Sequence, residues 1–93
     1  MNLRHMEVFR AVMLTGGVKG AAELLHVSQP AVSKMLAQAA RHSGLVLFER
    51  IKGRLVPTPE AQQLYDEVEN LWRGVERVAD VTRSLADPQT GSL

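Results

Sequence analysis

Apolar residues recur every three to four positions along most of the chain, which is the spacing of a single apolar helix face. The spacing predicts helices over residues 3–14, 18–25, 28–42 and 59–86. Between residues 45 and 58 this period is lost, and two short apolar runs flank a basic turn. That pattern is typical of a two-stranded hairpin, with Gly53 near its tip.

Glycine, proline and hydroxyl residues lie at the predicted helix ends. Gly16 and Gly17 supply the open backbone conformations that end a helix, and Gly44 follows the third helix in the same way. Ser28 and Thr58 are suited to capping the helices that follow them, because each precedes a proline in the first helical turn.

The predicted elements form a mainly α fold. Three helices and a two-stranded wing make a winged helix-turn-helix over residues 1–58. A long linker helix occupies residues 59–87, and residues 88–93 have the composition of a linker. One small domain with an appendage fits the length of 93 residues.

Charge divides the chain where the linker helix begins. Residues 1–58 carry eight basic and three acidic side chains, a net charge of +5. Residues 59–93 carry three basic and seven acidic side chains, a net charge of −4. The basic half could meet a polyanion such as DNA, although ordinary solvated surface charge accounts for the asymmetry equally well.

The second and third predicted helices have the pattern of a pair that crosses closely at a short turn. Ala21 and Ala22 are small enough for the two helices to cross at a steep angle, and the side chain of Val27 can fill the space inside the turn. Val32 and Leu36, four residues apart, are expected to face inward from the third helix.

The opposite face of the third helix carries side chains that can read DNA bases. Gln29, Pro30, Ser33 and Lys34 are short or can form hydrogen bonds, which lets a helix enter the major groove and contact base edges. Gln29 could bond N6 and N7 of adenine, and Pro30 could contact a thymine methyl group. Ser28 and the backbone N–H groups of the first turn could hold a phosphate.

Apolar residues on the last helix follow alternating steps of four and three, which is a heptad seam. That helix would extend for about 40 Å at roughly 1.5 Å per residue, too far for the preceding domain to cover. The same helix of a second subunit is expected to cover the seam about a two-fold axis, which predicts a homodimer. Folding back on its own domain, chiefly over the first turns, is the alternative. The predicted seam comprises Leu64, Val68, Leu71, Val75, Val78, Thr82 and Leu85, with Trp72 and Tyr65 beside it.

Several of these runs together resemble the LysR-type transcriptional regulators. Residues 21–34, AAELLHVSQPAVSK, are similar to the helix-turn-helix signature of that family. Residues 47–50 and the pair Thr58-Pro59 match its wing and the start of its linker helix. Residues 1–4 and 9–16 also resemble the branch that controls opine and amino-acid catabolism.

The resemblance implies a dimeric bacterial regulator that binds double-stranded DNA at an inverted-repeat operator. Its linker helices would pair antiparallel, and full-length chains could assemble further into tetramers. A small-molecule effector would bind only to a C-terminal domain beyond this sequence, with its hinge beginning at residues 88–93. Residues 17–20 depart from the family pattern, which puts a side-chain cap and phosphate contacts at the second helix in doubt. The implied base-reading residues are Gln29, Pro30, Ser33 and Lys34, and the implied backbone-contacting residues are Lys19, Arg50, Lys52 and Arg54.

Other classes of protein lack support in the sequence. It contains no paired carboxylates in a pocket-forming context, no nucleophile motif and no phosphate-binding glycine loop, so neither an enzyme nor a cofactor is expected. His5, His26 and His42 lack the spacing of metal ligands, and surface or capping roles are expected for them. The absence of cysteine excludes disulfides and fits a cytoplasmic protein, and no apolar run reaches the roughly 20 residues of a membrane span.

The competing hypothesis is a helical protein–protein interaction module, with the winged helix used for docking and the long helix for oligomerisation. The two hypotheses differ in where they place the polar side chains of the third helix. Burial of Gln29 and Ser33 in the core would exclude the DNA-binding interpretation.

Overall fold

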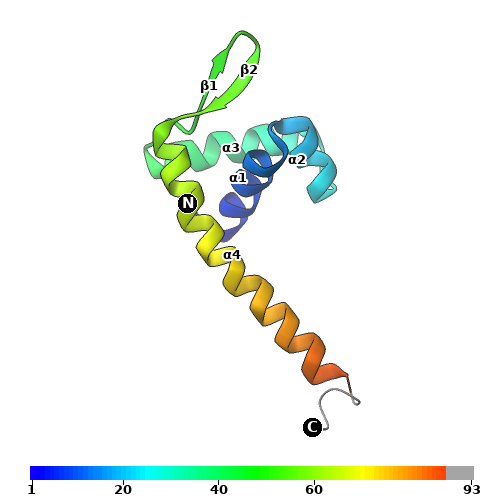
Figure 1. Ribbon diagram of the computed structural model, residues 1–93. Helices are drawn as coiled ribbons and strands as arrows, with labels where there is room; N and C mark the ends of the chain where they lie inside the picture. Colours follow the sequence, from blue (N-terminus) through cyan, green and yellow to red (C-terminus); the bar gives the residue numbers. More distant parts are fainter. Residues whose placement is uncertain (88–93) are drawn as a thin grey trace.

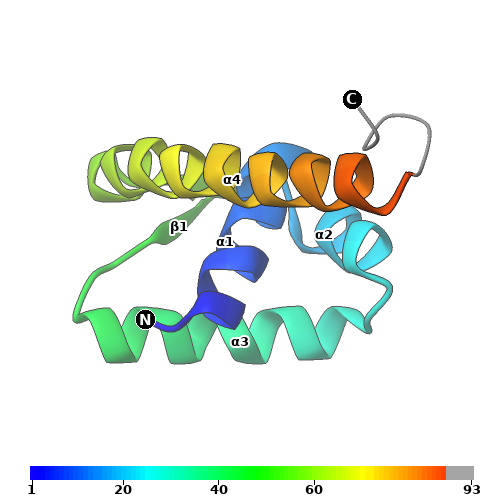
Figure 2. The ribbon, with the colours of Figure 1, turned by 90° about the horizontal axis from the view of Figure 1, so that it is seen from below.

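The computed structural model describes residues 1–87, which contain four helices and one two-stranded sheet. The elements are α1 (Leu3–Thr15), α2 (Val18–Leu25), α3 (Gln29–Ser43), β1 (Phe48–Ile51), β2 (Arg54–Pro57) and α4 (Pro59–Ala86). The hairpin projects from one side of the α1–α3 unit, and α4 extends away from it (Figure 1). In the second view α1 lies between α4 and α3 (Figure 2). The predicted winged helix-turn-helix with a long final helix is therefore confirmed, while the predicted start of a hinge at 88–93 lies outside the described residues.

The helix ends follow the capping chemistry of the sequence. Gly16 and Gly44 take left-handed conformations, with φ of 86° and 72°, directly after α1 and α3. Ser28 accepts a hydrogen bond from the backbone N–H of Ala31 at 3.2 Å, as an N-cap does. His26 ends α2 with φ of 57°, a left-handed conformation that few non-glycine residues adopt, so the turn between α2 and α3 carries some backbone strain.

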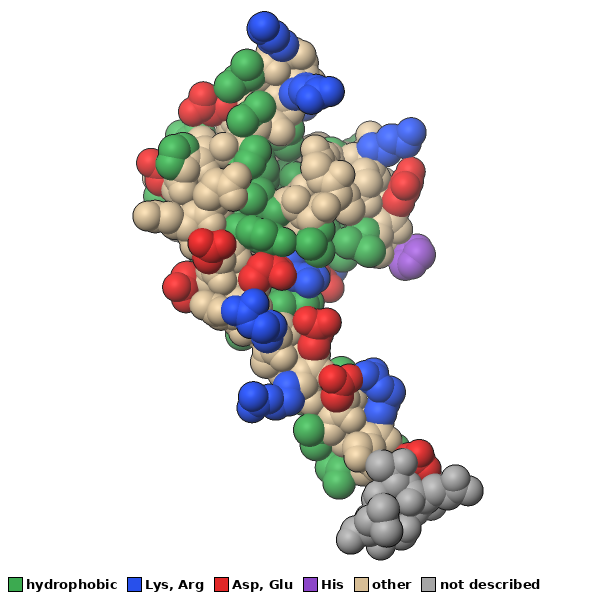
Figure 3. Space-filling view, viewed as in Figure 1, with side chains coloured by type: hydrophobic (Ala, Val, Ile, Leu, Met, Phe, Trp, Pro, Cys, Tyr) green, Lys and Arg blue, Asp and Glu red, His purple; other side chains and the backbone are tan. Residues whose placement is uncertain are grey.

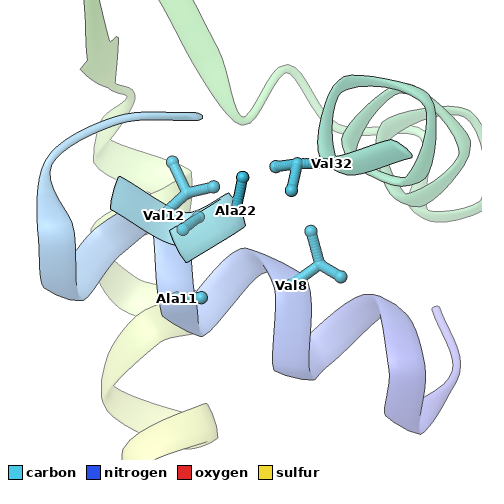
Figure 4. Close-up of a cluster of buried hydrophobic side chains, with 6 residues drawn as sticks. Val8, Ala11, Val12, Ala22 and Val32 are labelled. Atoms are coloured by element: carbon cyan, nitrogen blue, oxygen red, sulfur yellow. The ribbon is translucent and has the colours of Figure 1, made fainter. Parts of the chain in front are cut away.

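A first apolar cluster holds α1, α2 and α3 together. Ala21 and Ala22 are both buried on α2, and their small side chains allow the close helix crossing that the sequence predicted. Leu36 is half-buried against the same cluster, so the inward face of α3 is the predicted one. The side chains converge from all three helices (Figure 4). The buried members are Val8, Ala11, Val12, Ala21, Ala22 and Val32.

The wing is a tight antiparallel hairpin. Ile51 pairs with Arg54, and Lys52 and Gly53 between them have φ of 52° and 77°. Two consecutive residues with positive φ are typical of a type I′ turn, whose twist matches the twist of the two paired strands. The predicted position of Gly53 at the tip is confirmed.

The apolar run before the hairpin is not part of the strand. β1 begins only at Phe48, whereas Leu47 is buried beneath the hairpin and Val46 is 63% exposed. The run was expected to enter the hairpin because it is continuously apolar. It is divided instead because Leu47 packs with Phe9 of α1 and Ala39 of α3.

A second apolar cluster joins α1 and α3 to the start of α4. Met6 and Met13 are partly buried against it, as expected for core-filling methionines. Phe9 lies 5.9 Å from Phe48, ring centroid to ring centroid, which links the cluster to the base of the hairpin. The cluster thereby fixes where α4 begins. Its buried members are Phe9, Ala39, Leu47, Ala61 and Val68.

The predicted seam on α4 is too long at its N-terminal end. Val68 is only 3% exposed, and Leu64 and Trp72 are partly buried, because all three pack against their own domain in the second cluster. The alternative that the first turns fold back on the domain therefore holds for this part of the helix. The apolar residues that stay uncovered on the described part of α4 are Leu71, Val75, Val78, Val81 and Leu85.

Thr58 joins the hairpin, the segment before it and α4. Its buried hydroxyl group donates to the carbonyl oxygen of Val46 at 2.6 Å and accepts from the N–H of Ala61 at 3.1 Å. Its own backbone N–H donates to the carbonyl oxygen of Leu47 at 3.0 Å. One residue thus caps α4 and closes the base of the wing.

We expect Thr58→Val to lower the free energy of unfolding by about 2 kcal/mol, because the loss of the cap leaves buried polar groups unpaired. Urea denaturation followed by circular dichroism measures the change. Ser28→Ala is the matched control, since Ser28 is exposed and makes only the capping bond, worth about 1 kcal/mol. Equal losses in the two variants would show that Thr58 acts only as a cap.

Candidate nucleic-acid interface

One face of α3 is polar and open to solvent. Gln29, Pro30, Ser33 and Lys34 are all exposed, while Val32 on the other side of the helix is completely buried. The periodicity of the sequence placed these residues correctly because α3 is a regular helix packed along a single stripe. Gln29 and Ser33 are exposed and not buried in the core, so the structure does not exclude the DNA-binding interpretation.

A basic cleft of about 580 Å³ lies between the start of α2 and the hairpin. Lys19 lines it from α2, and Arg50 and Arg54 line it from the two strands. The residues that line the cleft include no acidic side chain. Lys52 is exposed at the hairpin tip beyond the cleft, where basic side chains gather in the space-filling view (Figure 3).

The start of α2 opens into this cleft without a side-chain cap. Gly17 is the N-cap residue and has no side chain to accept a hydrogen bond from the first turn. Gly17, Val18 and Lys19 line the cleft, so the positive end of the α2 dipole lies beside its basic side chains. The departure from the family pattern at residues 17–20 put a side-chain cap here in doubt, and the helix indeed has none.

An apolar groove of about 360 Å³ separates α3 from the hairpin. Ser33 and Ala37 line it from α3, and Arg50 and Leu55 line it from the strands. Arg50 lines both the groove and the basic cleft, so the two adjoin, and Ser33 brings the polar face of α3 to the edge of the same continuous surface. Hydrophobic side chains occupy the space between hairpin and helices in the view that shows this face (Figure 3).

Sequence reasoning missed the part of this surface that Leu45 and Val46 contribute. Both are exposed, and both line the groove beside Ser33. The available signal was the length of the apolar run at residues 45–48, which is more than one face of a short strand can bury.

The histidines do not form a metal site within residues 1–87, where no group of three or more potential ligands occurs. His5 is buried and completes a capping box at the start of α1: its backbone N–H donates to Oδ1 of Asn2 at 2.8 Å, and its Nδ1 accepts from the backbone N–H of Asn2 at 3.4 Å. The rings of His5 and His42 lie 5.2 Å apart. In the same stretch of chain, no helix is long and apolar enough to cross a membrane.

Comparison with known proteins identifies the relatives of the chain. Residues 3–62 match the family described as "Bacterial regulatory helix-turn-helix protein, lysR family". The chain is 46% identical over 93 residues to the transcriptional activator protein LysR of Escherichia coli (strain K12). It is 41% identical over 93 residues to OccR of Rhizobium meliloti, the octopine catabolism/uptake operon regulatory protein. These alignments cover all of this chain, but only 30% and 31% of the relatives.

Solved structures show the same arrangement of elements. The BenM DNA-binding domain in complex with benA site 1 DNA superimposes with a TM-score of 0.80 at 29% identity, covering 94% of this chain and 98% of that one. The DNA complex of the CbnR DNA-binding domain gives a TM-score of 0.77 at 28% identity, covering 94% and 100%. The predicted resemblance to this family, and to its opine regulators, is confirmed.

Gly20 allows α2 to lie close to the end of α1, and this contact positions the basic cleft. A Cβ atom at Gly20 would lie 2.6 Å from Cβ of Thr15, far inside van der Waals contact. We therefore expect Gly20→Ala to shift α2 and to lower the free energy of unfolding by about 1–3 kcal/mol, as overpacking does.

Gly74→Ala is the matched control for this prediction, because a Cβ atom at Gly74 in α4 would meet nothing within 4 Å. It should raise the free energy of unfolding by up to about 1 kcal/mol through helix propensity. Thermal and urea denaturation of the two variants measure both effects. A stabilising Gly20→Ala would contradict the close contact between α1 and α2.

Proposed function

The chain belongs to the lysR family of bacterial regulatory helix-turn-helix proteins, and on this premise we propose that two copies bind double-stranded DNA together at an inverted repeat. The family consists of transcription regulators rather than enzymes, and the chain matches its DNA-binding domain. The observation that carries the proposal is the continuous surface that joins the polar face of α3 to the basic cleft.

Base recognition is assigned to the exposed face of α3, which would lie in the major groove. Gln29, in the first turn, can form two hydrogen bonds to adenine, and Lys34 can donate to guanine. Ser33 can donate or accept, and Pro30 offers an apolar surface for a thymine methyl group. The small residues at Ser33 and Ala37 support close approach of the helix to the bases.

Backbone contacts are assigned to the cleft and the wing. A phosphate in the cleft would meet the uncapped N–H groups at the start of α2 together with Lys19, Arg50 and Arg54. Lys52, at the tip of the wing, would reach the next phosphate or the flanking minor groove. At the start of α3, Ser28 already caps Ala31, so its part in phosphate binding would use backbone N–H groups.

Pairing of two subunits is assigned to the uncovered stripe of α4. Its apolar side chains run from Leu71 to Leu85, which is 77% exposed, and nothing within the described chain covers them. Thr82 belongs to this stripe without leaving a polar group unpaired, because its hydroxyl group donates to the carbonyl oxygen of Val78 at 2.7 Å. A second α4 related by two-fold symmetry would bury these residues and present two copies of α3 to successive half-sites.

The chain spans about a third of the length of the curated relatives that it matches. In the proposed function, residues 1–58 bind DNA and residues 59–87 pair the subunits. An effector-binding domain, and any assembly into tetramers, would belong to a longer protein.

We expect Gln29→Ala to relax base preference at one position of each half-site and to cost about 1–3 kcal/mol per half-site. The loss follows from removing a side chain that contacts base edges without changing the charge of the domain. Selection of binding sites from random duplex DNA, followed by affinity measurements on the selected site, gives both quantities. An inverted repeat selected by the unmodified chain would support dimeric reading.

Arg54→Ala is the contrasting variant for this experiment. It should weaken binding to all sequences alike and lower the salt dependence by about one counterion, because Arg54 is assigned to the backbone. Equal loss of specific and non-specific binding in Gln29→Ala would contradict the assignment of Gln29. Weak binding of the unmodified chain without any sequence preference would favour the competing interaction-module hypothesis.

We expect Val78→Lys to weaken self-association by about tenfold or more, because it replaces a buried valine of the proposed interface by a charge. Val78 is 66% exposed in the single chain, so the variant should fold normally. Sedimentation at micromolar concentration measures the effect. Glu76→Lys, which places the same side chain on the opposite face of α4, is the control and should remain dimeric; a monomeric unmodified chain would refute the dimer.

A further inference from the structure

We infer that Arg10, Glu69 and Trp72 form a latch that fixes the direction in which α4 leaves the DNA-binding domain, and that the latch sets the spacing of the half-sites that a dimer can read. The inference rests on the proposed dimer and deepens it. None of these three residues lies on the surface assigned to DNA, and Trp72 was expected beside the dimer seam.

The latch connects two helices that are distant in the sequence. Nε of Arg10, on α1, lies 2.5 Å from Oε1 of Glu69, on α4. The guanidinium carbon of Arg10 also lies 5.1 Å from the centre of the Trp72 ring, three residues further along α4. One arginine thus holds two successive positions of α4 by a charged hydrogen bond and a cation–π contact.

Partial burial makes this ion pair firmer than a surface pair. The side chains of Arg10 and Glu69 are 20% and 27% exposed, whereas those of Arg83 and Asp80 are 72% and 69% exposed. The ion pairs Arg4–Glu7 and Arg83–Asp80 each lie within one helix, so they cannot orient one helix relative to another. The pair between Arg10 and Glu69 can.

The latch lies at the far edge of the contact between α4 and the domain. Before it, Ala61 and Val68 are buried in the second apolar cluster. After it, every residue from 73 to 87 is exposed. The packing of this cluster sets the crossing of α1 and α4 in outline. The directional contact at its far edge, where a force has the most leverage on the helix, restricts the angle further.

A small change of this angle has a large effect on the spacing of half-sites. In a dimer held together by α4, the domain turns about this edge, and at roughly 20 Å from it, the scale of a small domain, a swing of about 10° displaces a group by about 4 Å. One base pair occupies about 3.4 Å along the duplex. The two copies of α3 would therefore shift relative to each other by about one base pair.

The test uses duplexes that carry two copies of the selected half-site with the distance between them varied base pair by base pair. We expect the unmodified chain to prefer one spacing by about tenfold or more, and Arg10→Ala to reduce that preference to within about threefold. Affinity for a single half-site should change by less than about threefold, which reports that α3 remains folded and positioned. Arg4→Ala removes an arginine from the same helix without touching α4, so it is the matched control and should keep the sharp preference.

The exchanged pair Arg10→Glu with Glu69→Arg supplies the second test. It should restore a defined spacing, because the ion pair is rebuilt with its charges reversed. Arg10→Ala that keeps the profile of the unmodified chain would overturn the latch while leaving the dimer intact. An unmodified chain that sediments as a dimer but binds half-sites at every spacing alike would also overturn the latch, whereas one that sediments as a monomer would overturn the dimer, and the latch with it.

Discussion

The buried hydroxyl group of Thr58 is the constraint on which the rest of the architecture depends. It lies where the chain leaves the wing and enters α4, and the same oxygen serves the carbonyl of Val46 and the N–H of Ala61. The backbone N–H of Thr58 is bound to Leu47 as well. Neither the base of the wing nor the first turn of α4 can move without leaving a buried polar group unpaired, which costs more than the bond itself contributes. The position of the wing beside α3 follows from this junction, and so does the start of the helix that would carry a second subunit.

Helix α1 connects the helix pair α2 and α3 to the long helix α4. One side of it, with Val8 and Val12, belongs to the cluster that holds α2 and α3. The other side, with Phe9, belongs to the cluster that holds α4. Phe48, at the base of the wing, packs against both clusters. The two clusters therefore meet at α1, which contributes side chains to both. A displacement of α4 would be felt at α1, where Arg10 contacts it, as well as at Ala39 of α3.

The sequence predicted best what is decided by local chemistry. The bounds of α2 and α4 follow from glycines, prolines and capping hydroxyl groups, which act within a single turn of the chain. It predicted less well what depends on distant surfaces. Leu47 and Val68 have the same local pattern as exposed neighbours, and only the position of Phe9 and Ala39 in space decides that they are buried. Val81 was missed for a different reason: a straight helix drifts from a seven-residue repeat by about 20° per heptad, so by the last repeat Val81 and Thr82 flank the stripe together.

The negative charge of α4 matters because the domain that precedes it is basic. Non-specific attraction to phosphates acts on the whole chain, and a long basic helix would lie along the duplex and compete with α3. On α4 the arginines are largely engaged with neighbours in the same helix: Arg73 with Asn70, and Arg83 with Asp80. Glu60 and Asp66 remain exposed on this helix, and residues 59–93 together carry a net charge of −4. In the proposed complex, repulsion between this segment and DNA would disfavour orientations that lay α4 along the duplex. The charge asymmetry that is ambiguous in the sequence alone is therefore consistent, in the folded chain, with α3 and the wing as the surface that faces DNA.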